Sequence, residues 1–289
     1  MRFAPISSRT LLGIETGDAH LMSTHPSQSQ PAAAEAFYRR AISLLLNAGL
    51  PFMIGGGYAV RIYAGVTRKT KDIDLFLLPE DVERALAQLA SAGIQAELVF
   101  SHWLAKARAG EHFIDLVFNS GNGCCPVDQE WFDHATDCTW MGLPLKLCPP
   151  EESIWQKAFI MERERYDGAD VAHLIKACAA RMDWRRLLWR FGASWQVLLS
   201  HLVLFSFIYP DHQAAIPEWL MLELSARLEK KIRLPESAAG VCRGTLLSRE
   251  QYLSDINGCG YVDPRLPPNG AVTAEQLARW TPPAAPDVR

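Results

Sequence analysis

The sequence lacks the patterns that mark several large classes of protein. None of its 7 cysteines belongs to a Cys-x-x-Cys pair, so neither a zinc site nor a disulfide framework is indicated, and we expect reduced thiols. No Walker A sequence occurs, and a Gly-x-Gly-x-x-Gly motif starting at Gly55 fails because position 60 is Val60. These absences argue against a P-loop and against a dinucleotide-binding fingerprint.

A long apolar run and a strong charge of one sign are also missing. Acidic Glu15 and Asp18 follow too soon for a signal peptide to form near the start. The most apolar later segment, residues 198–209, contains His201 and is too short to cross a bilayer. The net charge of −3 does not indicate a chain built to coat nucleic acid or an anionic membrane. We therefore expect a cytoplasmic protein with no membrane partner.

The chain has 289 residues, of which 49% are hydrophobic, enough for one large or two modest domains. Hydrophobic patterns predict an α+β fold, in which a mixed β-sheet flanked by helices is followed by a helical C-terminal domain. We expect a loose leader over residues 1–32, with Met22 as an alternative start, a sheet domain over 33–145, a helical domain over 146–265 and an irregular proline-rich tail over 266–289.

The predicted elements follow from periodicity, glycines and prolines. Strands are expected at 51–54, 72–78, 95–100, 103–107 and 112–118, with the last two forming a hairpin that turns at Ala109-Gly110. Helices are expected at 33–47, from Tyr58, from Pro79, and at 151–165, 170–180, 184–190, 195–208 and 217–228.

Two acids, Asp72 and Asp74, lie on one predicted strand, and a third, Asp115, lies on another that is otherwise apolar. Because strand side chains alternate, Asp72 and Asp74 point to the same face. Neighbouring carboxylates repel each other unless a cation or a shared proton lies between them, and oxygen ligands favour Mg²⁺ or Mn²⁺. We expect Asp72, Asp74 and Asp115 to converge on two metal ions, with Asp115 as the general base. A solvated edge strand or a turn is the alternative for the Asp-x-Asp pair.

A glycine turn, Gly55-Gly56-Gly57, directly follows a predicted strand. Glycine lets phosphate oxygens approach backbone amides, and the N-terminus of the next helix would favour an anion. A tight turn without a ligand is the alternative. The chain between the glycines and the acids is basic, which suits a triphosphate but also a solvated loop, and it contains Arg61, Arg68, Lys69 and Lys71.

The order of these motifs resembles the polymerase-β-like nucleotidyltransferase superfamily, including its bacterial AbiEii-like branch. The matching segments are Gly56-Gly57-Tyr58-Ala59-Val60, Arg68-Lys69-Thr70-Lys71-Asp72-Ile73-Asp74 and Asp115. The resemblance implies a nucleotidyltransferase-type sheet, an NTP donor, Mg²⁺ as cofactor and pyrophosphate as the leaving group. It also implies nucleotide-binding roles for Gly56, Gly57, Arg68 and Thr70.

Beyond residue 145 the resemblance is fainter and rests on residues 150–157 and 165–170. In AbiEii-type proteins a lysine of the second domain contacts nucleotide phosphate, which makes Lys157 a candidate for that role. Lys157 shares a helix face with apolar residues, where a lysine either meets an anion or extends to solvent. The roles of Asp167 and Asp170 stay open, and Asp167 has the alternative of capping the next helix.

The acceptor is not specified by the motifs, and a small molecule, a tRNA end and a protein side chain are all alternatives. A different class of function is a catalytically silent nucleotidyltransferase-fold module, or a toxin–antitoxin component with a partner protein. A phosphohydrolase that uses Asp72 as nucleophile is disfavoured because Phe76 stands where that signature carries threonine.

Overall fold

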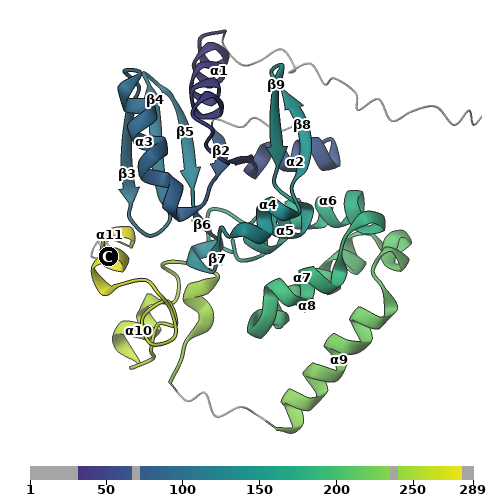
Figure 1. The fold of residues 1–289 in the computed structure, drawn as a ribbon. Helices are drawn as coiled ribbons and strands as arrows, with labels where there is room; N and C mark the ends of the chain where they lie inside the picture. Colours follow the sequence, from purple (N-terminus) through teal and green to yellow (C-terminus); the bar gives the residue numbers. More distant parts are fainter. Residues whose placement is uncertain (1–31, 67–71, 235–239, 282–289) are drawn as a thin grey trace, which may run out of the picture.

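The computed structural model describes residues 32–66, 72–234 and 240–281 (Figure 1). The helices are α1 (Ala32–Asn47), α2 (Gly56–Ala64), α3 (Val82–Ser91), α4 (Gln129–Asp133), α5 (Pro150–Ala158), α6 (Gly168–Cys178), α7 (Trp184–Phe191), α8 (Trp195–Ile208), α9 (Glu218–Arg233), α10 (Leu253–Gly258) and α11 (Ala274–Trp280). The strands are β1 (Met53–Ile54), β2 (Ile73–Phe76), β3 (Gln95–Phe100), β4 (Leu104–Ala109), β5 (His112–Val117), β6 (Asn119–Ser120), β7 (Cys125–Pro126), β8 (Thr136–Trp140) and β9 (Leu143–Leu147).

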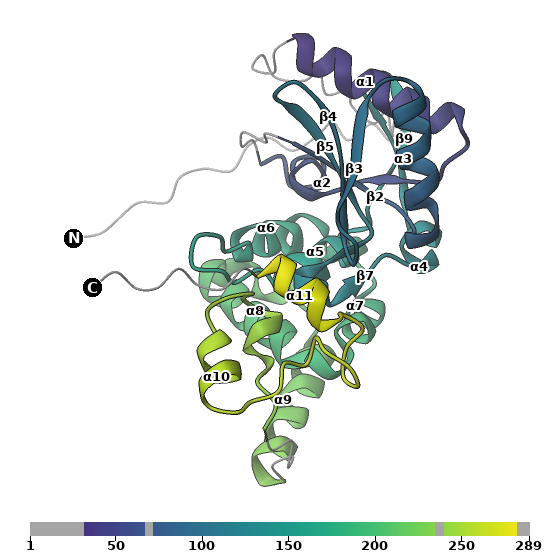
Figure 2. The same ribbon diagram turned by 90° about the vertical axis from the view of Figure 1, so that its left-hand side faces the viewer.

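The large sheet has seven strands in the order β3-β4-β5-β2-β1-β9-β8. The pairs β2–β5 and β1–β9 are parallel, and the other neighbouring pairs are antiparallel. Helices flank this sheet, and further helices follow it in a separate layer (Figures 1 and 2). The predicted α+β fold is therefore confirmed, as are the helix at 33–47 and the hairpin at Ala109-Gly110.

The two faces of the sheet contact different layers. Ile73 and Leu75 of β2 pack in the core that includes α1 and α3, which lie together against the sheet (Figure 2). Phe76 of β2 and Val117 of β5 belong to a second core shared with the helices after β9. Because strand side chains alternate, Asp74 lies on the same face as Phe76, toward the helical domain.

The β8–β9 hairpin was not predicted, and the predicted domain boundary at residue 145 falls inside β9. Pro144 lies inside β9, although proline has no amide to donate to a ladder. In the structure Pro144 pairs with Thr139 of β8, whereas β1 pairs only with Lys146 and Leu147. The missing amide therefore lies where β1 does not reach. The sheet domain accordingly extends to Leu147.

The helix predicted at 151–165 ends earlier, at Ala158 of α5. The chain then leaves the helix because the Met161 amide donates to the Leu247 carbonyl at 3.0 Å. A partner so distant in sequence leaves no local pattern, so the early end could not be predicted from the segment itself.

The prediction of an irregular tail from residue 266 is wrong for residues 274–280, which form α11. Thr273 and Gln276 make a capping box at its start, with each side chain bonded to the other's backbone amide. Gln276 also donates to Ser101 Oγ in the β3–β4 loop at 3.1 Å, so α11 packs back on the sheet domain. Of the predicted leader, residues 1–31 lie outside the described residues.

One helical run among the described residues, Trp184–Ile208, is long and apolar enough to cross a membrane by length and composition. The prediction from residues 198–209 alone did not include this longer run. It consists of α7 and α8 with a 3-10 turn at Gly192–Ser194 between them. Only 28% of its most apolar window is buried, and Phe207 of α8 is 82% exposed. The α7 half, in contrast, contributes arginines to a buried network of charges.

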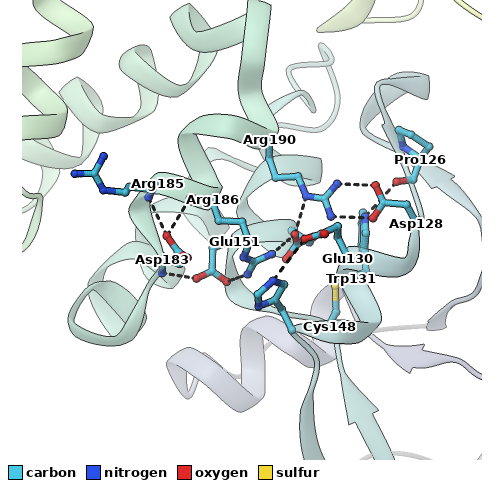
Figure 3. A network of polar contacts seen from close by, with 12 residues as sticks. Pro126, Asp128, Glu130, Trp131, Cys148, Glu151, Asp183, Arg185, Arg186 and Arg190 are labelled. Atoms are coloured by element: carbon cyan, nitrogen blue, oxygen red, sulfur yellow. Dashed lines mark hydrogen bonds and ion pairs between the residues drawn. The ribbon is translucent and has the colours of Figure 1, made fainter.

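That network connects the sheet domain to the helical domain (Figure 3). Arg190 of α7 donates to both oxygens of Asp128 at 2.7 and 2.8 Å, and to Glu152 of α5 at 2.9 Å. Arg186 donates to Glu151 at 2.6 Å and also to Glu152. Glu152 is 0% exposed, so its charge depends on these guanidinium groups.

Replacing Arg190 with methionine keeps an unbranched apolar stem but removes the guanidinium group. Glu152 then stays buried with one partner fewer. We expect Arg190→Met to lower the free energy of unfolding by about 3 kcal/mol, measured by urea denaturation. The control is Arg227→Met, which removes a partly exposed pair with Glu223 on α9 and should cost less than about 1 kcal/mol. Equal losses in the two variants would contradict the structural role of the network.

Candidate functional site

The parallel pairing of β2 and β5 places two of the predicted acids side by side. Asp74 and Asp115 are direct register partners, and Asp72 immediately precedes β2. The three carboxylates interact, because Asp72 and Asp115 both raise the pKa of Asp74, and Asp72 raises that of Asp115. The structure thus brings together the acids that the sequence predicts as a group.

The carboxylates of the acid cluster repel one another. Burial is the largest cause that raises the pKa of Asp74 from 3.8 to about 7, followed by the repulsion from Asp72 and Asp115. The positive charges of Lys157 and Arg165 act in the opposite direction. A cation placed among these carboxylates would therefore be stabilised by them.

The glycine turn lies directly against the acids. Gly56 has a φ of +55°, and a Cβ at this residue would lie 1.6 Å from Oδ2 of Asp74, so the position requires glycine. The amide of Gly55 donates to the Asp74 carbonyl at 3.0 Å. The helix predicted from Tyr58 begins earlier, at Gly56, with Gly57 as its second residue. Its N-terminal turn therefore starts beside the Asp74 carboxylate.

Two predicted nucleotide contacts, Arg68 and Thr70, lie in residues 67–71, outside the described residues. Lys69 and Lys71 of the same basic stretch lie there too. Arg61 is described, and it belongs to the last turn of α2. Of the predicted basic stretch, only Arg61 therefore has a described position relative to the acids.

Lys157, the candidate from the helical domain, is held by two carboxylates. Its side chain is 4% exposed, and Nζ lies 3.0 Å from Asp167 and 2.8 Å from Asp170. Arg165 donates to both oxygens of Asp167 at 3.0 and 2.9 Å. Although burial opposes ionisation, the bonds from Arg165 and Lys157 lower the pKa of Asp167 to about 2. The Asp167 side chain makes no cap bond at the start of α6, so the capping alternative is wrong.

Sequence reasoning missed Lys106 of β4, which is the direct partner of Asp115 in the hairpin. Its Nζ lies 2.6 Å from Oδ1 of Asp115, and the two side chains are 17% and 14% exposed. The signal was present, because a hairpin that pairs Ala109 with His112 must also pair residue 106 with residue 115.

The donor set fits a divalent cation. Asp72, Asp74 and Asp115 offer only oxygen ligands, which suit Mg²⁺ or Mn²⁺, and Oδ2 of Asp74 can take its place only because Gly56 has no Cβ, which would lie 1.6 Å from it. One oxygen of Asp115 is engaged by Lys106. Within residues 32–66, 72–234 and 240–281, no three His, Cys, Asp or Glu side chains are grouped as a ready metal site. A cation would therefore be held mainly by Asp72 and Asp74 unless Asp115 left Lys106.

Residues 34–189 match the family described as nucleotidyl transferase of unknown function (DUF2204). The chain belongs to this nucleotidyl transferase family. The match begins in α1 and ends in α7, so it includes the acids, the glycine turn and Lys157. It confirms the resemblance to nucleotidyltransferases that the order of these motifs predicts. No curated protein matches the chain significantly.

Several solved structures are similar to this chain at low sequence identity. The antibiotic-resistance factor ANT(2'')-Ia is 19% identical, with a TM-score of 0.41, over 60% of this chain and 98% of its own. An antigenic nucleotidyltransferase-like protein from Paracoccidioides brasiliensis is 20% identical, with a TM-score of 0.42, over 63% and 91%. JHP933 from Helicobacter pylori is 14% identical, with a TM-score of 0.37, over 72% and 100%.

The contact between Gly56 and Asp74 can be tested with alanine. Gly56→Ala and the control Gly49→Ala both place a Cβ at a positive φ, but nothing lies within 4 Å of the Cβ at Gly49. We expect Gly49→Ala to cost about 1 kcal/mol of unfolding free energy and Gly56→Ala clearly more.

Removing the Asp74 side chain should relieve the clash, so Asp74→Ala should partly restore the stability of Gly56→Ala and leave Gly49→Ala unchanged. A double-mutant cycle from urea denaturation gives this coupling. Additive losses in the Gly56–Asp74 cycle would contradict the contact.

Proposed function

We propose that this nucleotidyl transferase moves a nucleoside monophosphate from an NTP to a hydroxyl or similar group of an acceptor. The proposal is supported above all by the direct pairing of Asp74 with Asp115 on the sheet face that adjoins Gly56. Membership of the family supplies the reaction class, and this pairing supplies the groups that such a reaction requires.

In the proposed reaction the acceptor oxygen forms a bond to the α-phosphorus of the NTP. The bond from that phosphorus to the oxygen bridging the β-phosphate breaks, and pyrophosphate leaves with the electron pair. Asp115 is the candidate base for the acceptor proton, since it lies beside Asp74 on the same face. A divalent cation, when bound by Asp72 and Asp74, would lower the pKa of the attacking hydroxyl and offset phosphate charge. In the proposed reaction a second metal ion would offset charge on the leaving phosphates.

Positive charge for the triphosphate comes from both sides of the site. The amides at the start of α2, beside Gly56 and Gly57, are suited to phosphate oxygens. Arg165 is 66% exposed and interacts with Asp72 and Asp74, so its guanidinium is accessible to a nucleotide. Lys157 is buried, contributes its charge at longer range, and holds the carboxylates of Asp167 and Asp170 in place.

Incubation with each labelled NTP, Mg²⁺ or Mn²⁺, and acceptor pools of small molecules, tRNA and protein would test the proposal. We expect pyrophosphate release and one class of labelled product, identified by its mass. Asp74→Asn should lower the rate at least about a hundredfold because it removes a carboxylate at the phosphates.

The matched control is Asp137→Asn on β8, since Asp137 is 86% exposed and forms an exposed ion pair with Lys146. It should keep full activity. A folded chain that binds NTP without transfer to any pool would instead favour the silent binding module or toxin–antitoxin component. Full activity in Asp74→Asn would refute the site.

A further inference from the structure

Lys106 places a positive charge inside the acid cluster. Lys106, Asp115 and Asp74 occupy one row across β4, β5 and β2, because each is the direct register partner of the next. The lysine Nζ lies 2.6 Å from Oδ1 of Asp115 and 4.3 Å from the centre of the Phe113 ring. The aromatic face and the carboxylate together hold the ammonium at this position.

A second lysine–aspartate pair in the same sheet provides a comparison. Lys146 and Asp137 are also direct cross-strand partners, with Nζ 2.8 Å from Oδ1. Their side chains are 49% and 86% exposed, against 17% and 14% for Lys106 and Asp115. Charges act more strongly when water is excluded, so Lys106 has a larger electrostatic effect than an ordinary surface lysine.

A divalent cation at Asp115 and the Lys106 ammonium would compete for the same carboxylate. With Lys106 in place, Oδ1 of Asp115 accepts a hydrogen bond from its ammonium group. That group is positively charged, as the metal would be. The metal would stay on Asp72 and Asp74, bind Oδ2 of Asp115 beside the positive charge of Lys106, or displace the lysine from Asp115. Each route has a cost in free energy: a lost ligand, repulsion by the lysine, or a broken ion pair. A site without the lysine would not have that cost.

Resting on the proposed function, we propose that Lys106 is an internal counter-ion that stands in for a divalent metal on Asp115 when no nucleotide is bound. It offsets part of the repulsion among the carboxylates and competes with the metal for Asp115. The chain on its own therefore binds a divalent cation weakly. Tight binding requires the additional oxygen ligands that a triphosphate supplies.

The test is a Mn²⁺ titration of the full chain without nucleotide, followed by the electron paramagnetic resonance signal of free Mn²⁺. Lys106→Met removes the charge and keeps the apolar stem, and we expect it to bind Mn²⁺ at least about tenfold more tightly than wild type. Lys106→Arg keeps the charge and should bind as wild type does. If Lys106→Met does not fold, Lys106→Gln carries the same expectation.

Lys146→Met is the matched control, because it removes the exposed cross-strand lysine and leaves the acids untouched. It should leave the Mn²⁺ affinity unchanged. Asp74→Asn added to Lys106→Met should abolish the gain, which places the bound Mn²⁺ at the acid cluster.

Equal Mn²⁺ affinity in wild type and in a folded Lys106→Met or Lys106→Gln variant, including no binding in either, would overturn the proposal. An equal gain in Lys146→Met would also overturn it. Since turnover is not the readout, the outcomes separate the two proposals. A gain at Lys106 in a chain that transfers no nucleotide would refute only the function, and an active chain without that gain would refute only the role of Lys106.

Discussion

Holding like-charged carboxylates side by side is the constraint on which the arrangement of this protein depends. The parallel register of β2 and β5 fixes Asp74 beside Asp115, and burial with mutual repulsion raises the pKa of Asp74 to about 7. Three cationic side chains offset this cost, namely Lys106, Lys157 and Arg165. They come from β4, α5 and the loop before α6, so both domains contribute to the electrostatics of one site.

The fold supports this site by burying the rest of the sheet. One face packs on α1 and α3 through residues such as Leu75, and Phe76 on the other face packs into the core of the helical domain. The acids thus lie where the sheet domain and the helical domain adjoin. The Arg190 bonds to Asp128 and Glu152 hold the two domains together close to this junction, so the position of Lys157 relative to Asp74 depends on a buried charge network.

The sheet acids and the glycine turn could be predicted because local rules govern them: strand alternation for Asp72 and Asp74, and backbone freedom at Gly56. The pairing of Lys106 with Asp115 also follows from the register of the predicted hairpin. A lysine between alanines on a strand, however, gives no sign of function by itself. The partners of Lys157 could not be predicted, since they depend on how the chain turns back after α5. The β8–β9 hairpin was not predicted, and Pro144 is tolerated in it because β1 pairs only with Lys146 and Leu147 of β9.

A crystal structure with Mn²⁺ and a non-hydrolysable NTP analogue would test the central claim most directly, since Mn²⁺ is located by its anomalous scattering. The account predicts an anomalous peak bonded to the carboxylates of Asp72 and Asp74, with the phosphates against the first amides of α2 and Asp115 on the same sheet face. Anomalous density elsewhere, or an Asp115 carboxylate directed to the face covered by α1 and α3, would contradict it.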